Sequence, residues 1–130
     1  MATVVFIVAN QVGHLHSTLK LAHDLRSRGE RVVYWSDEHG AACAQRWGFE
    51  VQAVPFLQLL DSAVARGSWR GSWRDQLRLA REHGRQVMRA VNAVPSAAAS
   101  LLRDWRPDLI VFDPFLLCYW PAFHRDGVAA

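Results

Sequence analysis

The sequence predicts an α/β protein built on a doubly wound parallel sheet with spatial strand order 3-2-1-4. First, residues Thr3–Ala9 (TVVFIVA) are apolar and mostly β-branched, without the alternation typical of a strand that has one face in solvent. Second, strand and helix patterns alternate through the first 54 residues, and a short apolar strand, Leu109–Phe112, follows later. Such a succession favours a Rossmann-like sheet with helices on both faces.

The first strand is followed by a loop and an amphipathic helix. We expect Asn10–His16 to form the loop, with Gly13 giving the backbone freedom to turn sharply. A hydroxyl of Ser17 or Thr18 can then cap the helix, which ends at Gly29.

Two further strands follow in the first half of the chain. Arg31–Ser36 (RVVYWS) predicts a buried strand, and Asp37 is placed to cap a short helix over Glu38–Trp47, closed by Gly48. The alternating segment Phe49–Val54 predicts a third strand nearer the sheet edge.

Helical patterns fill most of the second half. We expect one helix over Trp73–Val91 and, after Pro95, a second over Ala97–Trp105. The fourth strand then ends at Asp113, and an aromatic segment over Phe115–Phe123 is expected to be helical.

Composition indicates one domain and a limited set of partners. The 130 residues are 51% apolar, enough for a core, and the net charge of +3 comes from arginines interleaved with acids, so no nucleic-acid partner is expected. The N-terminal apolar run is too short for a transmembrane segment or a signal core, which predicts a soluble cytoplasmic protein. Cys43 and Cys118 lie in no metal or redox motif.

Two side chains are candidates for chemistry. Strands 1 and 4 are neighbours in the predicted order, so His14, after strand 1, and Asp113, at the end of strand 4, meet at the sheet's carboxyl edge. A carboxylate that accepts one imidazole N–H leaves the other nitrogen free to act as a general base. The alternative is that His14 is a surface or capping residue and Asp113 only caps the next helix.

Other site types are not supported by the spacing. The histidines lack metal-ligand spacing to one another or to cysteines, so no metal is expected. The loop NQVGHLHS has one glycine, whereas a dinucleotide fingerprint needs three and a phosphate loop needs a lysine.

Two patterns in the second half allow either a functional or a structural interpretation. The tandem repeat GSWRGSWR (residues 67–74) places Trp69 and Trp73 where they could wall an apolar ligand site, or it is a variable loop in which Ser72 caps the next helix. A stripe of arginines on the following helix could meet phosphate or an acidic partner, or form a solvated helix edge. Its members are Arg74, Arg78, Arg81, Arg85 and Arg89.

Nearly the whole chain resembles the N-terminal, acceptor-side domain of GT-B family 1 glycosyltransferases, including bacterial (UDP-)glycosyltransferases that modify macrolides and other natural products. The family begins with a strand, a GHxxP motif and a helix that ends in an RGH-like turn. Here Gly13-His14 matches the start of the motif, and Arg28-Gly29-Glu30 matches the turn. Its later turn is matched by Trp47-Gly48-Phe49, and its fourth-strand signature by RPDLIVFDPF (residues 106–115). His16 and Ser17 stand where the family commonly has asparagine and proline.

The resemblance implies a reaction and a set of site residues. His14 would deprotonate an acceptor hydroxyl, Asp113 would orient His14, and the hydroxyl would displace a nucleoside diphosphate from a sugar with inversion. Substrate-binding residues would be Gly13, His16, Trp69, Trp73, Phe115 and Tyr119.

The family's second domain, which binds the nucleotide sugar, has no counterpart in residues 1–130. We therefore expect a truncated acceptor-binding domain, with Val128–Ala130 as the start of a fifth strand, that is inactive alone. No cofactor is expected; the nucleotide-sugar cosubstrate would bind mainly to the missing domain. An uncovered sheet edge would favour self-association and marginal stability.

Three functions follow from these patterns. The first is the acceptor-binding half of an inverting glycosyltransferase acting on a small apolar acceptor, as a fragment or as one subunit of a split enzyme. The second is a non-catalytic interaction module that docks on a separate partner through the arginine stripe or through exposed core residues. The third is a small-ligand binder in which His14 and Asp113 are merely caps.

Overall fold

A computed structural model of the chain describes residues 1–54 and 72–123. Its centre is a four-stranded sheet with order β3-β2-β1-β4. Each neighbouring pair is parallel. The fold class and strand order expected from the sequence are therefore confirmed. The strands are β1 (Thr3–Ile7), β2 (Arg31–Ser36), β3 (Glu50–Ala53) and β4 (Leu109–Phe112).

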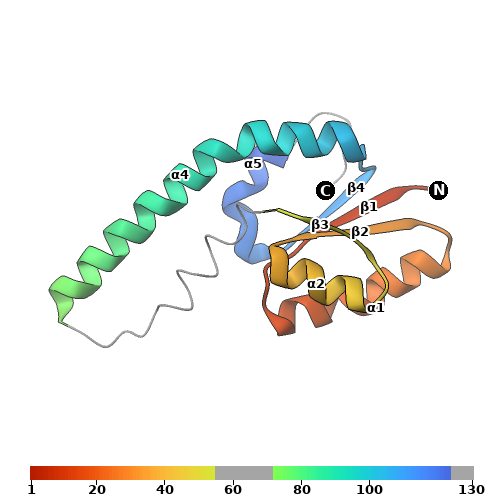
Figure 1. Cartoon of the computed structure of the whole chain (residues 1–130), viewed down its shortest axis with the longest axis horizontal. Coiled ribbons are helices and arrows are strands. Elements are labelled where there is room, and N and C mark those ends of the chain that lie inside the picture. Colours follow the sequence, from red (N-terminus) through yellow and green to blue (C-terminus); the bar gives the residue numbers. More distant parts are fainter. Residues whose placement is uncertain (55–71, 124–130) are drawn as a thin grey trace.

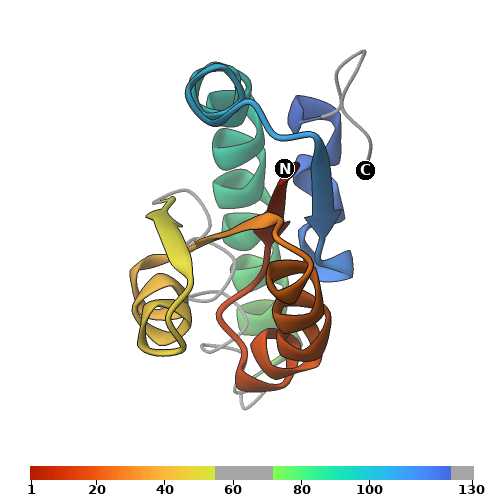
Figure 2. The same ribbon diagram turned by 90° about the vertical axis from the view of Figure 1, so that its right-hand side faces the viewer.

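Helices cover both faces of this sheet (Figures 1 and 2). On one face lie α1 and α2, and on the other lie α4, the 3₁₀ helix η2 and α5. Their bounds are α1 Val12–Ser27, α2 Glu38–Arg46, α4 Trp73–Trp105, η2 Pro114–Tyr119 and α5 Trp120–Phe123.

The two core layers explain the uninterrupted apolar pattern of the first strand. Val5 and Ile7 of β1 pack in the layer beneath α4 and α5, whereas Val4 and Phe6 pack in the layer beneath α1 and α2. Successive strand residues point to opposite faces, so a strand with both faces covered must be apolar at every position. All four side chains are buried.

Both α1 and α2 end as their glycines predict. Gly29 and Gly48 adopt left-handed backbone angles, with φ of 85° and 79°. The N–H of Glu30 then reaches the carbonyl of Leu25, and the N–H of Phe49 reaches that of Ala44. These are the 6→1 hydrogen bonds of the Schellman motif, and they return the chain directly into β2 and β3.

The start of α1 differs from the expectation. The helix begins at Val12, so Gly13, His14 and His16 lie in its first turns and not in a loop. Ser17 and Thr18 do not cap it: their hydroxyls donate to the carbonyls of His14 and Leu15, each three residues back. The cap position is Gln11, whose side chain makes no capping hydrogen bond. Gly13 is absent from the positive-φ glycines, so it is not needed for a sharp turn.

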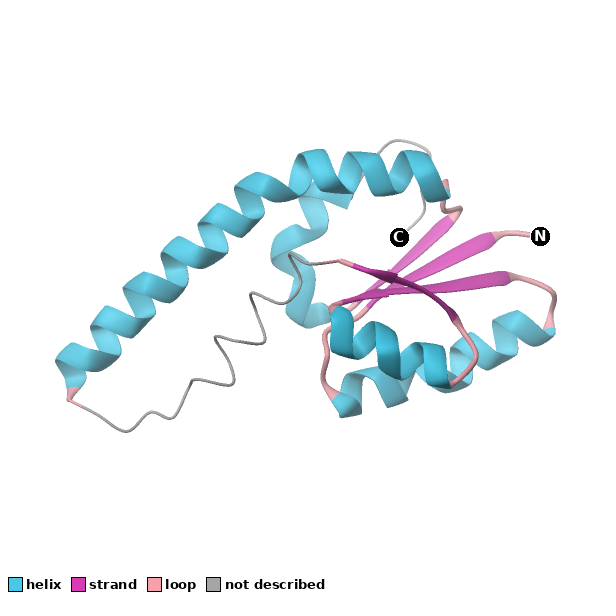
Figure 3. Ribbon diagram, viewed as in Figure 1, coloured by secondary structure: helices cyan, strands magenta, loops and turns pink. Residues whose placement is uncertain are grey.

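A second difference is that α4 is one continuous helix where two were expected (Figure 3). Pro95 lies inside it, although proline lacks the N–H that a helix interior needs. The residues around it compensate by packing, because Val94 and Ala98 are completely buried against the sheet and Leu102 nearly so. The N-terminal part of α4 projects beyond the sheet (Figure 1).

Some expectations fall on residues that the structure does not describe. Trp69, most of the tandem repeat and the fifth-strand segment Val128–Ala130 lie outside the described residues. Among the described helices, none combines the length and apolar character needed to cross a membrane.

An ion pair on the edge strand gives a pH-dependent prediction. Arg31 Nε and an Arg31 terminal nitrogen donate to the two carboxylate oxygens of Glu50 at 2.8 and 2.5 Å, which lowers the pKa of Glu50. A lowered carboxyl pKa stabilises the fold above the unfolded-state pKa of about 4.3, and this stability is lost as the pH falls through the lower folded-state value.

We therefore expect Glu50→Gln to be less stable than the wild type by ~0.5 kcal/mol at pH 7, since both side chains are exposed and screened by solvent. The difference should vanish near pH 2 and shrink in about 1 M salt. Urea unfolding at several pH values measures it. An equal difference at pH 7 and pH 2 would contradict this origin.

Candidate active site

The candidate site lies at the carboxyl ends of the neighbouring strands β1 and β4. Ile7 of β1 pairs with Phe112 of β4, and the N–H of Asp113 donates to the carbonyl of Ile7 at 2.9 Å. His14 follows β1 in the first turn of α1, while Asp113 directly follows β4. The parallel pairing therefore brings together two residues that are 99 positions apart.

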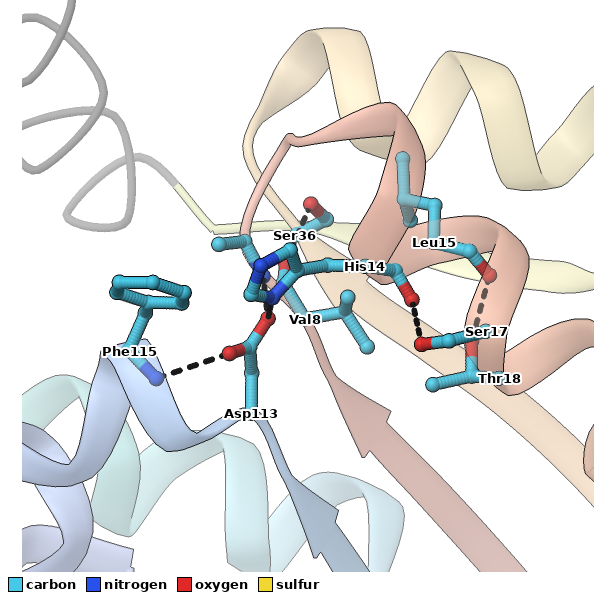
Figure 4. A network of polar contacts seen from close by, with 9 residues as sticks. Val8, His14, Leu15, Ser17, Thr18, Ser36, Asp113 and Phe115 are labelled. Atoms are coloured by element: carbon cyan, nitrogen blue, oxygen red, sulfur yellow. Dashed lines mark hydrogen bonds and ion pairs between the residues drawn. The ribbon is translucent and has the colours of Figure 1, made fainter.

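The expected contact between these two side chains is present (Figure 4). His14 Nδ1 lies 2.8 Å from Asp113 Oδ2, and the exposed fractions of the two side chains are 26% and 2%. The imidazole is thus partly open to solvent, and the carboxylate is buried.

Asp113 accepts hydrogen bonds from three different segments. Its Oδ2 receives the Ala9 N–H at 3.1 Å in addition to His14, and its Oδ1 receives the Phe115 N–H at 2.9 Å. The two backbone partners can only donate, so the carboxylate is an acceptor toward both of them. We therefore assign the proton to His14 Nδ1, which leaves Nε2 with its lone pair.

One apolar side chain, that of Phe115, packs against the imidazole of His14. The ring of Phe115 lies 4.7 Å from the imidazole, centroid to centroid, and is itself 63% exposed. Val12 on α1 and Leu117 on η2 are also exposed. An apolar molecule with a hydroxyl group could therefore contact this surface while its hydroxyl faces Nε2.

The other residues expected at the site are distributed differently. His16 is exposed, and its ring packs edge-on against Trp47 at 5.2 Å. Tyr119 is buried in the core layer beneath α4 and is not on the surface. Trp73 is exposed at the start of α4, on the part that projects beyond the sheet. Gly13 is exposed beside His14 in the first turn of α1.

The sequence analysis did not identify the hydrogen bonds of Ser36, Asp37 and Asn10, which lie around the end of β1 and the segment that follows it. Ser36 donates to the carbonyl of Val8 at 2.8 Å, and Asn10 donates to Asp37 at 3.2 Å. Asp37 was expected only as the cap of α2, a role it also performs by accepting the Gly40 N–H at 2.7 Å. The sequence feature that could have indicated these contacts is a serine followed by an aspartate at the carboxyl end of a buried strand.

A further contact fixes α1 on the sheet. The Thr18 hydroxyl lies 2.9 Å from the hydroxyl of Tyr34 on β2. Burial raises the pKa of Tyr34, and the hydrogen bond to Thr18 opposes part of this rise. Within the described residues, no group of three or more metal-ligating side chains comes together.

No protein-family model and no curated protein matches the sequence. Solved structures do match, and they are glycosyltransferases of bacterial natural-product pathways. SsfS6 from Streptomyces sp. SF2575 aligns over 94% of this chain and 36% of its own length, at 20% identity and a TM-score of 0.60. The calicheamicin glycosyltransferase CalG4 aligns over 94% of this chain and 27% of its own, at 23% identity and a TM-score of 0.60.

VinC, a glycosyltransferase solved in complex with dTDP, aligns over 92% of this chain and 31% of its own, at 17% identity and a TM-score of 0.59. At these identities the likeness is one of fold. The chain spans about a third or less of the length of these three proteins. Its Rossmann-like sheet is thus the fold of one part of a GT-B glycosyltransferase.

The hydrogen bonds of Asp113 predict the tautomer of His14. In Asp113→Ala the His14 Nδ1–H loses its acceptor and the N–H groups of Ala9 and Phe115 lose theirs, so we expect destabilisation by ~1–3 kcal/mol and a shift of neutral His14 toward the Nε2–H form. Imidazole ¹⁵N chemical shifts, recorded at a pH where histidine is neutral, measure the tautomer.

Asp108→Ala is the matched control, because Asp108 also accepts a backbone N–H, from Thr3 at 2.7 Å, and has no imidazole partner among the described residues. It should leave His14 unchanged. The proton assignment fails if Asp113→Ala leaves the His14 shifts at their wild-type values.

Proposed function

We propose that the chain is the acceptor-binding half of an inverting glycosyltransferase that moves a sugar from a nucleotide-sugar donor to a hydroxyl of a small apolar acceptor. The observation that carries the proposal is the 2.8 Å contact between His14 and Asp113 at the carboxyl edge of the sheet. The fold likeness to natural-product glycosyltransferases supports it.

In this mechanism His14 is the general base. Its Nε2 takes the proton of the acceptor hydroxyl as the oxygen attacks the anomeric carbon of the sugar. The new C–O bond forms as the bond from that carbon to the nucleoside diphosphate breaks, with inversion. Asp113 holds the Nδ1–H tautomer and stabilises the imidazolium that results, and general-base help of this kind contributes ~10²–10⁴-fold in rate.

The acceptor would bind on the apolar surface beside His14. The exposed ring of Phe115 supplies a face 4.7 Å from the imidazole. A flat or macrocyclic apolar acceptor can cover this ring, and its removal from water supplies binding energy. The specificity would then come from where the acceptor's hydroxyl meets Nε2.

The donor would be bound mainly by a second domain or subunit. VinC and SsfS6 have each been solved with a thymidine nucleotide, and the chain covers only part of both proteins. The chain itself has no glycine-rich phosphate loop after β1. A separate donor-binding part would place the leaving group above the carboxyl edge of the sheet.

Acceptor binding can be tested on the chain alone. Titration with hydroxylated aromatic and macrocyclic aglycones should give saturable NMR shifts at His14 and Phe115. Phe115→Ala should weaken the binding by about tenfold, the effect of losing ~1.4 kcal/mol of ring contact. If no aglycone perturbs either residue, this surface is not the acceptor site.

Catalysis requires a donor-binding part, which a fusion to the remainder of SsfS6 would supply. We expect release of TDP from a dTDP-sugar to depend on acceptor, and His14→Ala to lower kcat by ~10²–10⁴-fold. His39→Ala, which removes an exposed histidine on α2, is the control. Equal turnover in His14→Ala and wild type would exclude the base role.

One feature favours a second candidate, the non-catalytic interaction module. The projecting part of α4 exposes Trp73, Leu77 and Met88, and arginines at the next positions flank them. Arg78 pairs with Asp75 and Arg85 with Glu82 at 3.6 and 3.9 Å. If this helix docks on a second copy of the chain, Leu77→Glu should abolish concentration-dependent association in sedimentation velocity, and His14→Ala should not affect it. A monomer at all concentrations would exclude a second copy as the partner.

A further inference from the structure

Two neighbouring residues at the end of β2 hold the segment that leads to His14. Ser36 is completely buried and Asp37 nearly so. The Ser36 hydroxyl donates to the carbonyl of Val8 at 2.8 Å, and Asp37 Oδ2 accepts the Asn10 side-chain amide at 3.2 Å. The Val8 N–H also donates to the carbonyl of Trp35 at 3.1 Å. Val8 is thus held to β2, and Asn10 to the residue that directly follows β2.

Residue 9, between them, is fixed from the opposite side. The Ala9 N–H donates to Asp113 Oδ2 at 3.1 Å, and this is the same oxygen that His14 Nδ1 contacts. The segment Val8–Asn10 therefore lies stretched between β2 and Asp113. A shift of this segment toward or away from Asp113 would change the contact of Asp113 with the imidazole as well.

The start of α1 has no side-chain cap, since Gln11 makes no side-chain hydrogen bond. Its N–H donates to the carbonyl of Ala9 at 2.7 Å, and its carbonyl accepts the N–H groups of His14 and Leu15 at 2.9 and 3.0 Å. The helix is held on the sheet by the buried Leu15 and by the Thr18–Tyr34 contact, and its N-terminal end, which carries His14, is joined to Val8–Asn10 through Gln11.

The close approach of α2 to this anchor depends on a glycine. A Cβ atom at Gly40 would lie 2.1 Å from Ser36 Oγ, so only glycine leaves the hydroxyl in place. Asp37 Oδ1 accepts the Gly40 N–H at the same point. The start of α2 and the anchor of the β1–α1 connection are built from the same two side chains.

From these contacts we propose that Ser36 and Asp37 are positioning residues for His14. Through Val8 and Asn10 they hold the β1–α1 connection in the register at which the imidazole meets Asp113, so that Nδ1 keeps its proton and Nε2 faces the acceptor. This role deepens the proposed function and rests on His14 being its base.

The test reads the imidazole directly in the 130-residue chain and needs no substrate. Ser36→Ala removes one anchor, and Asn10→Ala removes the other while leaving Asp37 free to cap α2. In each variant the ratio of Nδ1–H to Nε2–H tautomer of neutral His14, from ¹⁵N shifts, should fall about three- to tenfold, the factor that one net hydrogen bond represents.

Controls separate positioning from general destabilisation. Val32→Ala truncates a buried residue at the opposite end of β2, so it should lower Tm without changing the His14 tautomer ratio. In the Asp113→Ala background, Asn10→Ala should produce no further change, because the contact it positions is already lost. If Ser36→Ala does not fold, Asn10→Ala, on a less buried residue, decides the outcome.

The proposal is overturned if Asn10→Ala and Ser36→Ala lower Tm yet keep the wild-type tautomer ratio, or if Val32→Ala changes that ratio as much as they do. These results are independent of the proposed function. Loss of the tautomer effect with intact acceptor binding refutes the positioning role alone, whereas a clear tautomer effect without acceptor binding or turnover refutes the glycosyltransferase role alone.

Discussion

The buried carboxylate of Asp113 is the constraint on which this part of the molecule depends. A carboxylate removed from water needs hydrogen-bond donors, and Asp113 has them from the end of β1, from α1 and from η2. The start of η2, next to Asp113 in the sequence, and the β1–α1 region, about a hundred residues away, are therefore bound to one side chain. The contact between this carboxylate and His14 Nδ1 also determines which nitrogen of the imidazole carries the proton.

The site joins the two layers of the fold. His14 belongs to α1, which covers one face of the sheet, and Phe115 belongs to η2, which covers the other. The imidazole and the phenyl ring approach each other at the edge because β1 and β4 are paired there. Neither layer alone could build this surface, since each contributes only one side of it.

Several features were predictable because they are local. The apolar run of β1 indicated a strand covered on both faces, and Gly29 and Gly48 indicated helix ends, since few other residues adopt a left-handed backbone readily. The proximity of His14 and Asp113 followed from one topological rule, that strands 1 and 4 are neighbours in a doubly wound sheet.

The rest needed the tertiary structure. Ser17 looks like a helix cap, but α1 begins five residues earlier, and the Ser17 hydroxyl donates to the carbonyl of His14 inside the helix. Pro95 looks like a helix boundary, yet α4 continues through it because packing on both sides outweighs the missing N–H. The sequence by itself determined the strand order and the pair of residues that meet at its edge. Only the tertiary structure decided how their positions are held, because the anchoring hydrogen bonds of Ser36 and Asp37 span 27 or more residues and leave no periodic or local pattern.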